Sequence, residues 1–248
     1  MENIFGYLEH PKIDLMKINY LFLILLLIFS CKNEQKDGTT KNKSKSTPSV
    51  TCKNEVSFGD TFICLPKMEG MVETLHHPKI SDRINDLKDK TNITLGYYIS
   101  DDTFAQMEQI ESINYDNYFK VYAPIQGMDY RMTVSEMNQI TAMMTSGFLD
   151  KTLEETNNDL KTMGKTIALS MPTLIEKFSA NHNTSTLVIL MQIETENLRK
   201  ILAVSMTSII IKQRLIFVAY YLDYKNEETI DTLKKRNQLF IDAILEVN

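Results

Sequence analysis

Apolar residues recur along this chain with two different spacings, and each spacing marks its own kind of segment. Runs rich in β-branched and aromatic residues predict strands, because these side chains pack well on a pleated sheet. Such runs cover residues 92–100, 117–123, 184–194, 200–211 and 214–224. The last two runs are separated only by Lys212-Gln213, so we expect an antiparallel hairpin there, although Lys-Gln is not a preferred turn pair.

Helices are predicted where apolar residues return every three or four positions. These segments are residues 101–113, 135–144, 151–163 and a C-terminal stretch that Asn226 can cap. The expected inward residues are Phe104, Met107 and Ile110 in the first helix, Met137, Ile140, Met143 and Met144 in the second, and Ile230, Leu233, Phe240, Ile241 and Ile244 in the last. The order of elements predicts one α+β domain over residues 51–248, a mostly antiparallel sheet flanked by helices as an α/β/α sandwich.

The most apolar run of the chain, residues 21–29, is too short to span a membrane, which takes about 18 residues. It fits the apolar core of a secretory signal, with Lys17 before it and the small Ser30 after it. Ile28-Phe29-Ser30-Cys31 resembles the lipobox of bacterial lipoproteins, in which the cysteine thiol receives diacylglycerol and the signal is then removed. The alternative is an uncleaved anchor helix that begins near Met16.

The lipobox resemblance implies that residues 1–30 are a signal peptide and that Cys31 is the mature, acylated N-terminus. The segment from Met16 to Cys31 is already a complete signal, so we interpret residues 1–15 as a start-site overcall. The expected location is therefore the bacterial cell envelope, with the protein lipid-anchored at the outer membrane, on its periplasmic face or at the cell surface. The membrane is then a partner through the lipid, including palmitate, on Cys31.

Residues 31–50 are rich in Lys, Asn, Ser and Thr, which predicts a flexible tether. Lys32-Asn33-Glu34 resembles the export tag of surface lipoproteins in Bacteroidetes. The whole chain has a net charge of −5. The tether contributes +3 and residues 1–30 contribute −1, so residues 51–248 must carry −7. An acidic domain without a basic run argues against nucleic acid as a partner.

Cys52 and Cys64 are the two cysteines of the predicted domain. An exported protein meets an oxidising compartment, and extended segments on either side of Phe58-Gly59-Asp60 could bring the two thiols together. We therefore predict a disulfide, which would stabilise the fold by about 3 kcal/mol. No histidine or further cysteine has ligand spacing to either residue, so we predict no metal site.

The closing part of the chain carries a family resemblance. "RLIFVAYYLDY" followed by "NEETIDTLKKRNQLFIDAILEVN" resembles the end of the Mog1/PsbP-like fold, and "GDTFICLP" is similar to its opening strand. The resemblance implies a sheet flanked by helices and a non-enzymatic accessory or binding role. The match consists of pattern and contains no catalytic motif, so no site residue is carried over.

Four residues are candidates for acid–base chemistry: Glu73, His76, His77 and Asp101. Glu73 stands three residues before His76, so a helix there would place both on one face. A surface loop before Pro78 is the alternative, and adjacent histidines that point in different directions favour it. For Asp101, helix capping is the alternative explanation.

Two functions remain open. The first is a lipid-anchored envelope protein with a non-enzymatic binding or accessory role toward a protein or small ligand. The second is an envelope hydrolase that joins His76 or His77 to a carboxylate such as Glu73 or Asp101. The sequence has no GxSxG, SxxK or HExxH motif and no glycine-rich phosphate loop, so no cofactor is expected and the first function is favoured.

Tyrosines on the predicted strands offer one further feature. Neighbours such as Tyr220 and Tyr221 must face opposite sides of the sheet. These rings could line a groove for a peptide or small ligand, or pack against the helices, and packing is the favoured alternative. The tyrosines concerned are Tyr97, Tyr98, Tyr118, Tyr122, Tyr220, Tyr221 and Tyr224.

Overall fold

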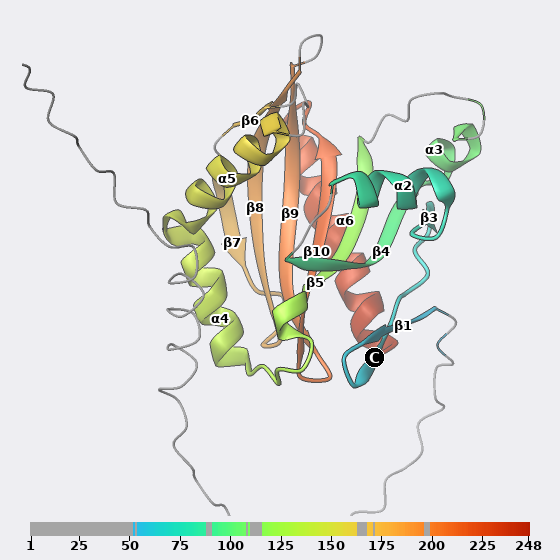
Figure 1. Ribbon diagram of the computed structural model, residues 1–248, viewed down its shortest axis with the longest axis vertical. Helices are drawn as coiled ribbons and strands as arrows, with labels where there is room; N and C mark the ends of the chain where they lie inside the picture. Colours follow the sequence, from blue (N-terminus) through green and yellow to red (C-terminus); the bar gives the residue numbers. More distant parts are fainter. Residues whose placement is uncertain are drawn as a thin grey trace, which may run out of the picture. The chain divides into compact units, whose positions relative to one another are not determined.

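Figure 1 shows the computed structural model of the protein. The structure describes residues 52, 54–87, 91–107, 109, 116–162, 168–170, 172–195 and 199–248, all within the unit Ser49–Asn248. The predicted signal peptide, the predicted lipidation site Cys31 and the predicted tether lie outside the described residues, so they stay predictions.

An antiparallel sheet organises the described residues. Eight strands pair in the order β3-β4-β5-β10-β9-β8-β6, and β7 also pairs with β8. They span Met71–Glu73 (β3), Asn92–Ser100 (β4), Asn117–Pro124 (β5), Ala168–Leu169 (β6), Thr173–Phe178 (β7), Thr184–Glu194 (β8), Arg199–Ile211 (β9) and Arg214–Asp223 (β10). β1 (Glu55–Phe58) and β2 (Thr61–Cys64) form a separate hairpin. The predicted mostly antiparallel sheet is confirmed.

Helices cover both faces of this sheet. α6 (Glu227–Glu246) packs behind it in Figure 1, and α2 (Pro78–Leu87), α4 (Val134–Met143) and α5 (Leu149–Thr162) lie in front. The short α3 (Asp101–Gln106) follows β4, η1 (Ile125–Gly127) follows β5, and a π turn, η2 (Met144–Phe148), joins α4 to α5. The predicted flanking of the sheet by helices is therefore confirmed.

The main core lies between α6 and the sheet. The ring of Phe240 stacks on Phe119 at 4.7 Å between centroids and meets Tyr98 edge to face at 5.1 Å. Phe119 in turn stacks on Tyr220 at 4.0 Å. Asn226 caps α6, as predicted, by accepting a hydrogen bond from the backbone N–H of Thr229. The predicted stripe is buried except for Ile230, which is half-buried, and it also includes Thr229 and Asn237.

The β9–β10 hairpin closes through Lys212 and Gln213, both with positive φ (48° and 64°). This is the geometry that two-residue hairpin turns require, and side chains other than glycine adopt it at about 1–2 kcal/mol each. The long pairing of β9 with β10 offsets this cost. Lys212 also donates from Nζ to the carbonyl oxygen of Phe62 at 2.8 Å, which ties this turn to the β1–β2 hairpin.

Several predicted details are wrong. The helix predicted over 101–113 is found as α3, which ends at Gln106, while residues 108 and 110–113, with the predicted inward Ile110, lie outside the described residues. Its N-cap is Ser100, with Asp101 in the first turn. Phe104 was expected inward but is 39% exposed, and Met143 is 44% exposed. β3, β6, β7 and α2 were not predicted at all, because each is short or presents few apolar residues to the core.

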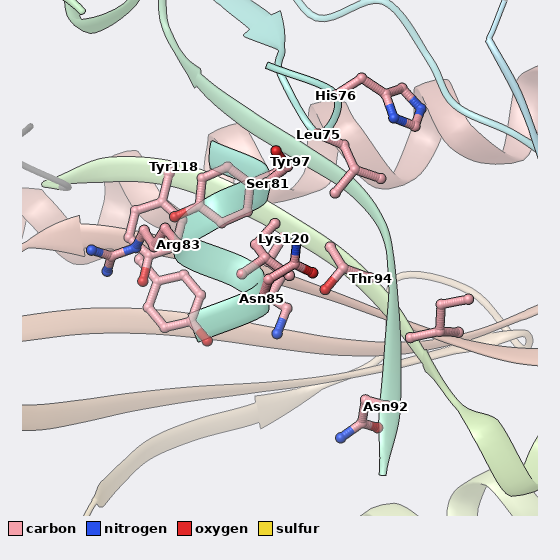
Figure 2. A pocket seen from close by; sticks show the side chains of 13 residues that line it. Leu75, His76, Ser81, Arg83, Asn85, Asn92, Thr94, Tyr97, Tyr118 and Lys120 are labelled. Carbon is pink, nitrogen blue, oxygen red and sulfur yellow. The ribbon is translucent and has the colours of Figure 1, made fainter. Parts of the chain in front are cut away.

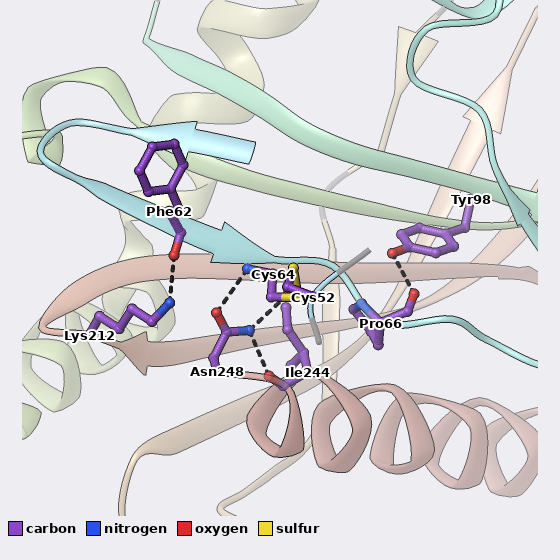
Figure 3. The surroundings of a disulfide bond; sticks show 8 residues. All are labelled: Cys52, Phe62, Cys64, Pro66, Tyr98, Lys212, Ile244 and Asn248. Atoms are coloured by element: carbon purple, nitrogen blue, oxygen red, sulfur yellow. Dashed lines mark hydrogen bonds between the residues drawn. A yellow bond between two sulfur atoms is a disulfide. The ribbon is translucent and has the colours of Figure 1, made fainter. Parts of the chain in front are cut away.

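The disulfide between Cys52 and Cys64, with Cα atoms 5.7 Å apart, is consistent with the predicted pairing. Figure 3 shows how the last residue joins it. The side chain of Asn248 accepts from the backbone N–H of Cys64 at 2.8 Å and donates to the Cys64 and Ile244 carbonyls, also at 2.8 Å. The two ends of the described domain are thus fastened to each other.

Asp60, at the tip of the β1–β2 hairpin, anchors this element to the sheet. Its carboxylate accepts a hydrogen bond from Arg214, whose side chain is only 3% exposed at the start of β10. The hydrogen bond from Arg214 holds the pKa of Asp60 below its usual value. The ion pair therefore complements the Lys212 contact described above.

Gly59 lies in the same turn, where the hairpin comes close to the backbone that follows β5. It has a φ of 60°, and a Cβ there would overlap the carbonyl oxygen of Met128. We expect Gly59→Ala to lower the free energy of unfolding by at least about 2 kcal/mol, because backbone strain and the clash add. Gly127→Ala is the matched control: its Cβ would lie 3.8 Å from Pro124, so the change should stay within about 0.5 kcal/mol. Equal urea midpoints for both variants would contradict the expectation.

Candidate functional site

The strand tyrosines divide between the two faces of the sheet. Tyr98 and Tyr220 face α6 and belong to its core, whereas Tyr97, Tyr118 and Tyr221 face the side that carries α2. A bulge in β4 between Thr94 and Gly96 shifts the alternation. The sequence left open whether the tyrosines pack against helices or line a groove. Tyr98 and Tyr220 pack under α6, whereas Tyr97, Tyr118 and Tyr221 line a cavity on the opposite face.

Tyr97, Tyr118 and Tyr221 form a continuous stack, which we call the tyrosine ladder. Tyr118 and Tyr221 stand directly opposite on β5 and β10, with ring centroids 4.4 Å apart and planes 10° from parallel. Tyr97 of β4 stacks on the other side of Tyr118 at 5.3 Å and 15°. Burial raises the pKa of Tyr221 to about 12, so its hydroxyl keeps its proton at neutral pH.

The ladder belongs to the wall of an open cavity of about 550 Å³ beside α2 (Figure 2). This volume lies in the range of small-molecule sites. Polar side chains from three elements surround the ladder: Ser81, Arg83 and Asn85 from α2, Asn92 and Thr94 from β4, and Lys120 from β5. No aspartate or glutamate lines the cavity within the part of the chain that the structure describes.

α2 is the element that places Arg83 and Asn85 at the cavity. Pro78 occupies its first position, where a missing N–H costs nothing. Ile80 is fully buried in a small cluster with Tyr97, and Ile84 packs against the same cluster. These two isoleucines, four residues apart, hold the helix on the sheet. Arg83 and Asn85 flank Ile84 on the cavity side.

Lys120 reaches the cavity from the centre of β5. It lies on the same face as Tyr118 and Tyr122, two residues away on either side. Its ammonium sits over the ring of Tyr122, 5.2 Å from the centroid. A cation–π contact of this kind keeps the charge on the α2 side of the sheet.

The four acid–base candidates occupy different surroundings. Glu73 lies on β3, not on a helix, and its Oε1 accepts from the backbone N–H groups of Leu75 and Tyr97 at 2.9 and 3.2 Å. The idea that a helix aligns Glu73 with His76 is therefore wrong. His76 lines the cavity at the end away from Arg83 (Figure 2).

The other two candidates lie off the cavity lining. The ring of His77 meets Phe104 edge to face at 6.2 Å. Asp101 is exposed in the first turn of α3. Of the four candidates, His76 alone lines the cavity.

Two further searches concern the described residues only. Among them, no group of three or more His, Cys, Asp and Glu side chains could hold a metal ion. In the same part of the chain, no helix has the length and apolar character needed to cross a membrane.

Comparison with known proteins found one solved structure similar to this chain. No family model matches it, and no curated protein matches it. One solved structure, the Ran-binding protein Mog1p of Saccharomyces cerevisiae, is similar over 75% of this chain and 87% of that chain, with 9% sequence identity and a TM-score of 0.33. The fold class stated above follows from the strand pairing and the helices themselves.

Proposed function

We propose that this protein is a lipid-anchored component of a bacterial cell envelope that binds a small ligand without transforming it. The cavity beside α2 carries this proposal. It is open, of suitable volume, and built from side chains that converge from α2, β4, β5 and β10. The anchoring part of the proposal rests on the lipobox resemblance of residues 28–31.

Binding is favoured over hydrolysis by the surroundings of the acid–base candidates. A hydrolase would need a base or nucleophile within hydrogen-bond reach of the substrate and a group that orients it. His76 lies on the cavity, but Glu73 is engaged by two backbone N–H groups. Among the described lining residues no carboxylate stands beside His76.

A fragment screen tests the binding site. The full-length protein in detergent is screened against a small-molecule library by saturation-transfer NMR. Thr94→Trp fills the cavity with an indole from β4, so we expect the fragments that bind the native protein to bind at least about tenfold more weakly. Thr173→Trp, the same change at an exposed position on β7, should leave binding unchanged.

The outcomes separate the two functions. Fragment binding that survives Thr94→Trp, or a library that yields no bound fragment, would refute the binding site. Turnover of a bound fragment that His76→Ala abolishes would establish the hydrolase instead. Thermal unfolding of both tryptophan variants checks that the fold is retained.

A further inference from the structure

The stacking of the tyrosine ladder determines what the cavity wall offers a ligand. The facing sides of Tyr97, Tyr118 and Tyr221 cover one another, with planes within 15° of parallel. Both faces of Tyr118, the middle ring, are covered by its neighbours, so this ring can offer a ligand only its edge and its hydroxyl. A ring edge carries the positive part of the aromatic quadrupole, and a protonated phenol is a hydrogen-bond donor. This wall therefore suits acceptor atoms better than a flat aromatic ring.

The two charged side chains in the described lining of the cavity, Arg83 and Lys120, are both cations. Arg83 reaches the cavity from α2 and Lys120 from β5. Among the described residues the lining has no carboxylate, although residues 51–248 carry a charge of −7. A cleft lined by one sign of charge focuses its field and raises the local concentration of the opposite ion. The sign at this cavity is opposite to that of the domain.

We propose that the ligand of this cavity is a small, oxygen-rich organic anion. Its carboxylate or phosphate oxygens accept hydrogen bonds from Arg83 and Lys120, and its neutral oxygens meet Asn85, Asn92 and the hydroxyl of Tyr118. Arginine is suited to the bidentate recognition of either anionic group, and lysine supplies a point charge. This inference deepens the proposed binding function and rests on it.

Three hexose probes of similar size test the charge preference. Glucose is neutral, glucuronate adds a carboxylate and glucose 6-phosphate adds a phosphate. We expect at least one anion to bind the full-length protein about tenfold more tightly than glucose, measured by isothermal titration calorimetry. The better anion identifies which oxyanion the cavity prefers. Raising sodium chloride from about 50 to about 500 mM should weaken binding of the anion and leave binding of glucose unchanged, because salt screens charge at the exposed rim of the cavity.

Charge-removing variants assign the preference to the cavity. Arg83→Gln and Lys120→Gln should each lower the affinity for the anion about tenfold and leave the affinity for glucose unchanged. Lys235→Gln, on the exposed side of α6, is the control and should have no effect. Arg83 is exposed, so its variant is expected to fold normally, and thermal unfolding verifies this for all three.

Two results would overturn the inference. One is equal affinity for glucose and both anions, and the other is the absence of anion binding up to about 20 mM, a concentration that nearly saturates a site with a Kd of about 1 mM. Fragment hits that Thr94→Trp abolishes would keep the binding function intact in either case. A screen without hits removes the binding function itself, so the two failures are distinguishable.

Discussion

Replacing Cys31 with serine is expected to abolish the acylation of this protein and its maturation at that residue. The thiol is the attachment point for the acyl chains in the lipobox interpretation, and a hydroxyl does not replace it. Each buried CH₂ contributes about 0.8 kcal/mol to membrane binding, so two or more chains hold a protein stably where one holds it only marginally. Metabolic labelling with a palmitate analogue, followed by fractionation, gives the readout.

The matched control removes the other two cysteines. Cys52→Ser/Cys64→Ser eliminates the disulfide but should retain the label and the mature size, because neither residue follows the signal. Label that persists in Cys31→Ser, or that never appears on the native protein, would falsify the lipid anchor. The cavity and its proposed ligand would be unaffected by that result.

Replacing Phe240 with alanine is expected to cost about 3–5 kcal/mol of the free energy of unfolding. The side chain is fully buried, and its ring contacts Phe119 and Tyr98 in the core under α6. Truncation removes this apolar area and leaves a cavity that two other rings can fill only partly. Urea unfolding followed by circular dichroism measures the effect.

The neighbouring residue on α6 supplies the control. Leu239 is 53% exposed, so Leu239→Ala should change the free energy of unfolding by no more than about 0.5 kcal/mol. Both variants remove an apolar side chain from the same helix, and both introduce the best helix former. Similar losses for the two would show that α6 does not cover the sheet in the way described.

The elements that could be predicted from the sequence are those whose own residues determine them. β8, β9 and β10 are buried on both faces, so their near-continuous apolar runs appear directly in the sequence. α6 was predictable because its cap, Asn226, and its stripe agree. β7 was not, because as an edge strand it leaves Leu174 and Ile175 exposed and alternates weakly.

The cavity was only half predictable for a similar reason. Adjacent tyrosines such as Tyr220 and Tyr221 had to face opposite sides, and that part follows from the period of a strand. α2 was missed because within its described side chains it buries only Ile80 fully, with Ile84 as a partial second contact. Pro78 followed by isoleucines four residues apart was the available signal. The pairing of β4 with β5 places Lys120 beside Tyr97. This contact joins residues far apart in the sequence, so no local sequence pattern predicts it.

The disulfide also determines how the domain responds to mechanical load. With the lipid at Cys31 as proposed, a pull on the domain arrives along the chain at Cys52. The sulfur–sulfur bond passes that force directly to Cys64, so β1 and β2 lie outside the load path and cannot be peeled apart from their N-terminal end. The force then meets the hydrogen bonds between Cys64 and Asn248, which connect it to the end of α6. Tension is therefore shared with the longest helix of the domain, and the contacts of Arg214 and Lys212 to the hairpin help to resist it.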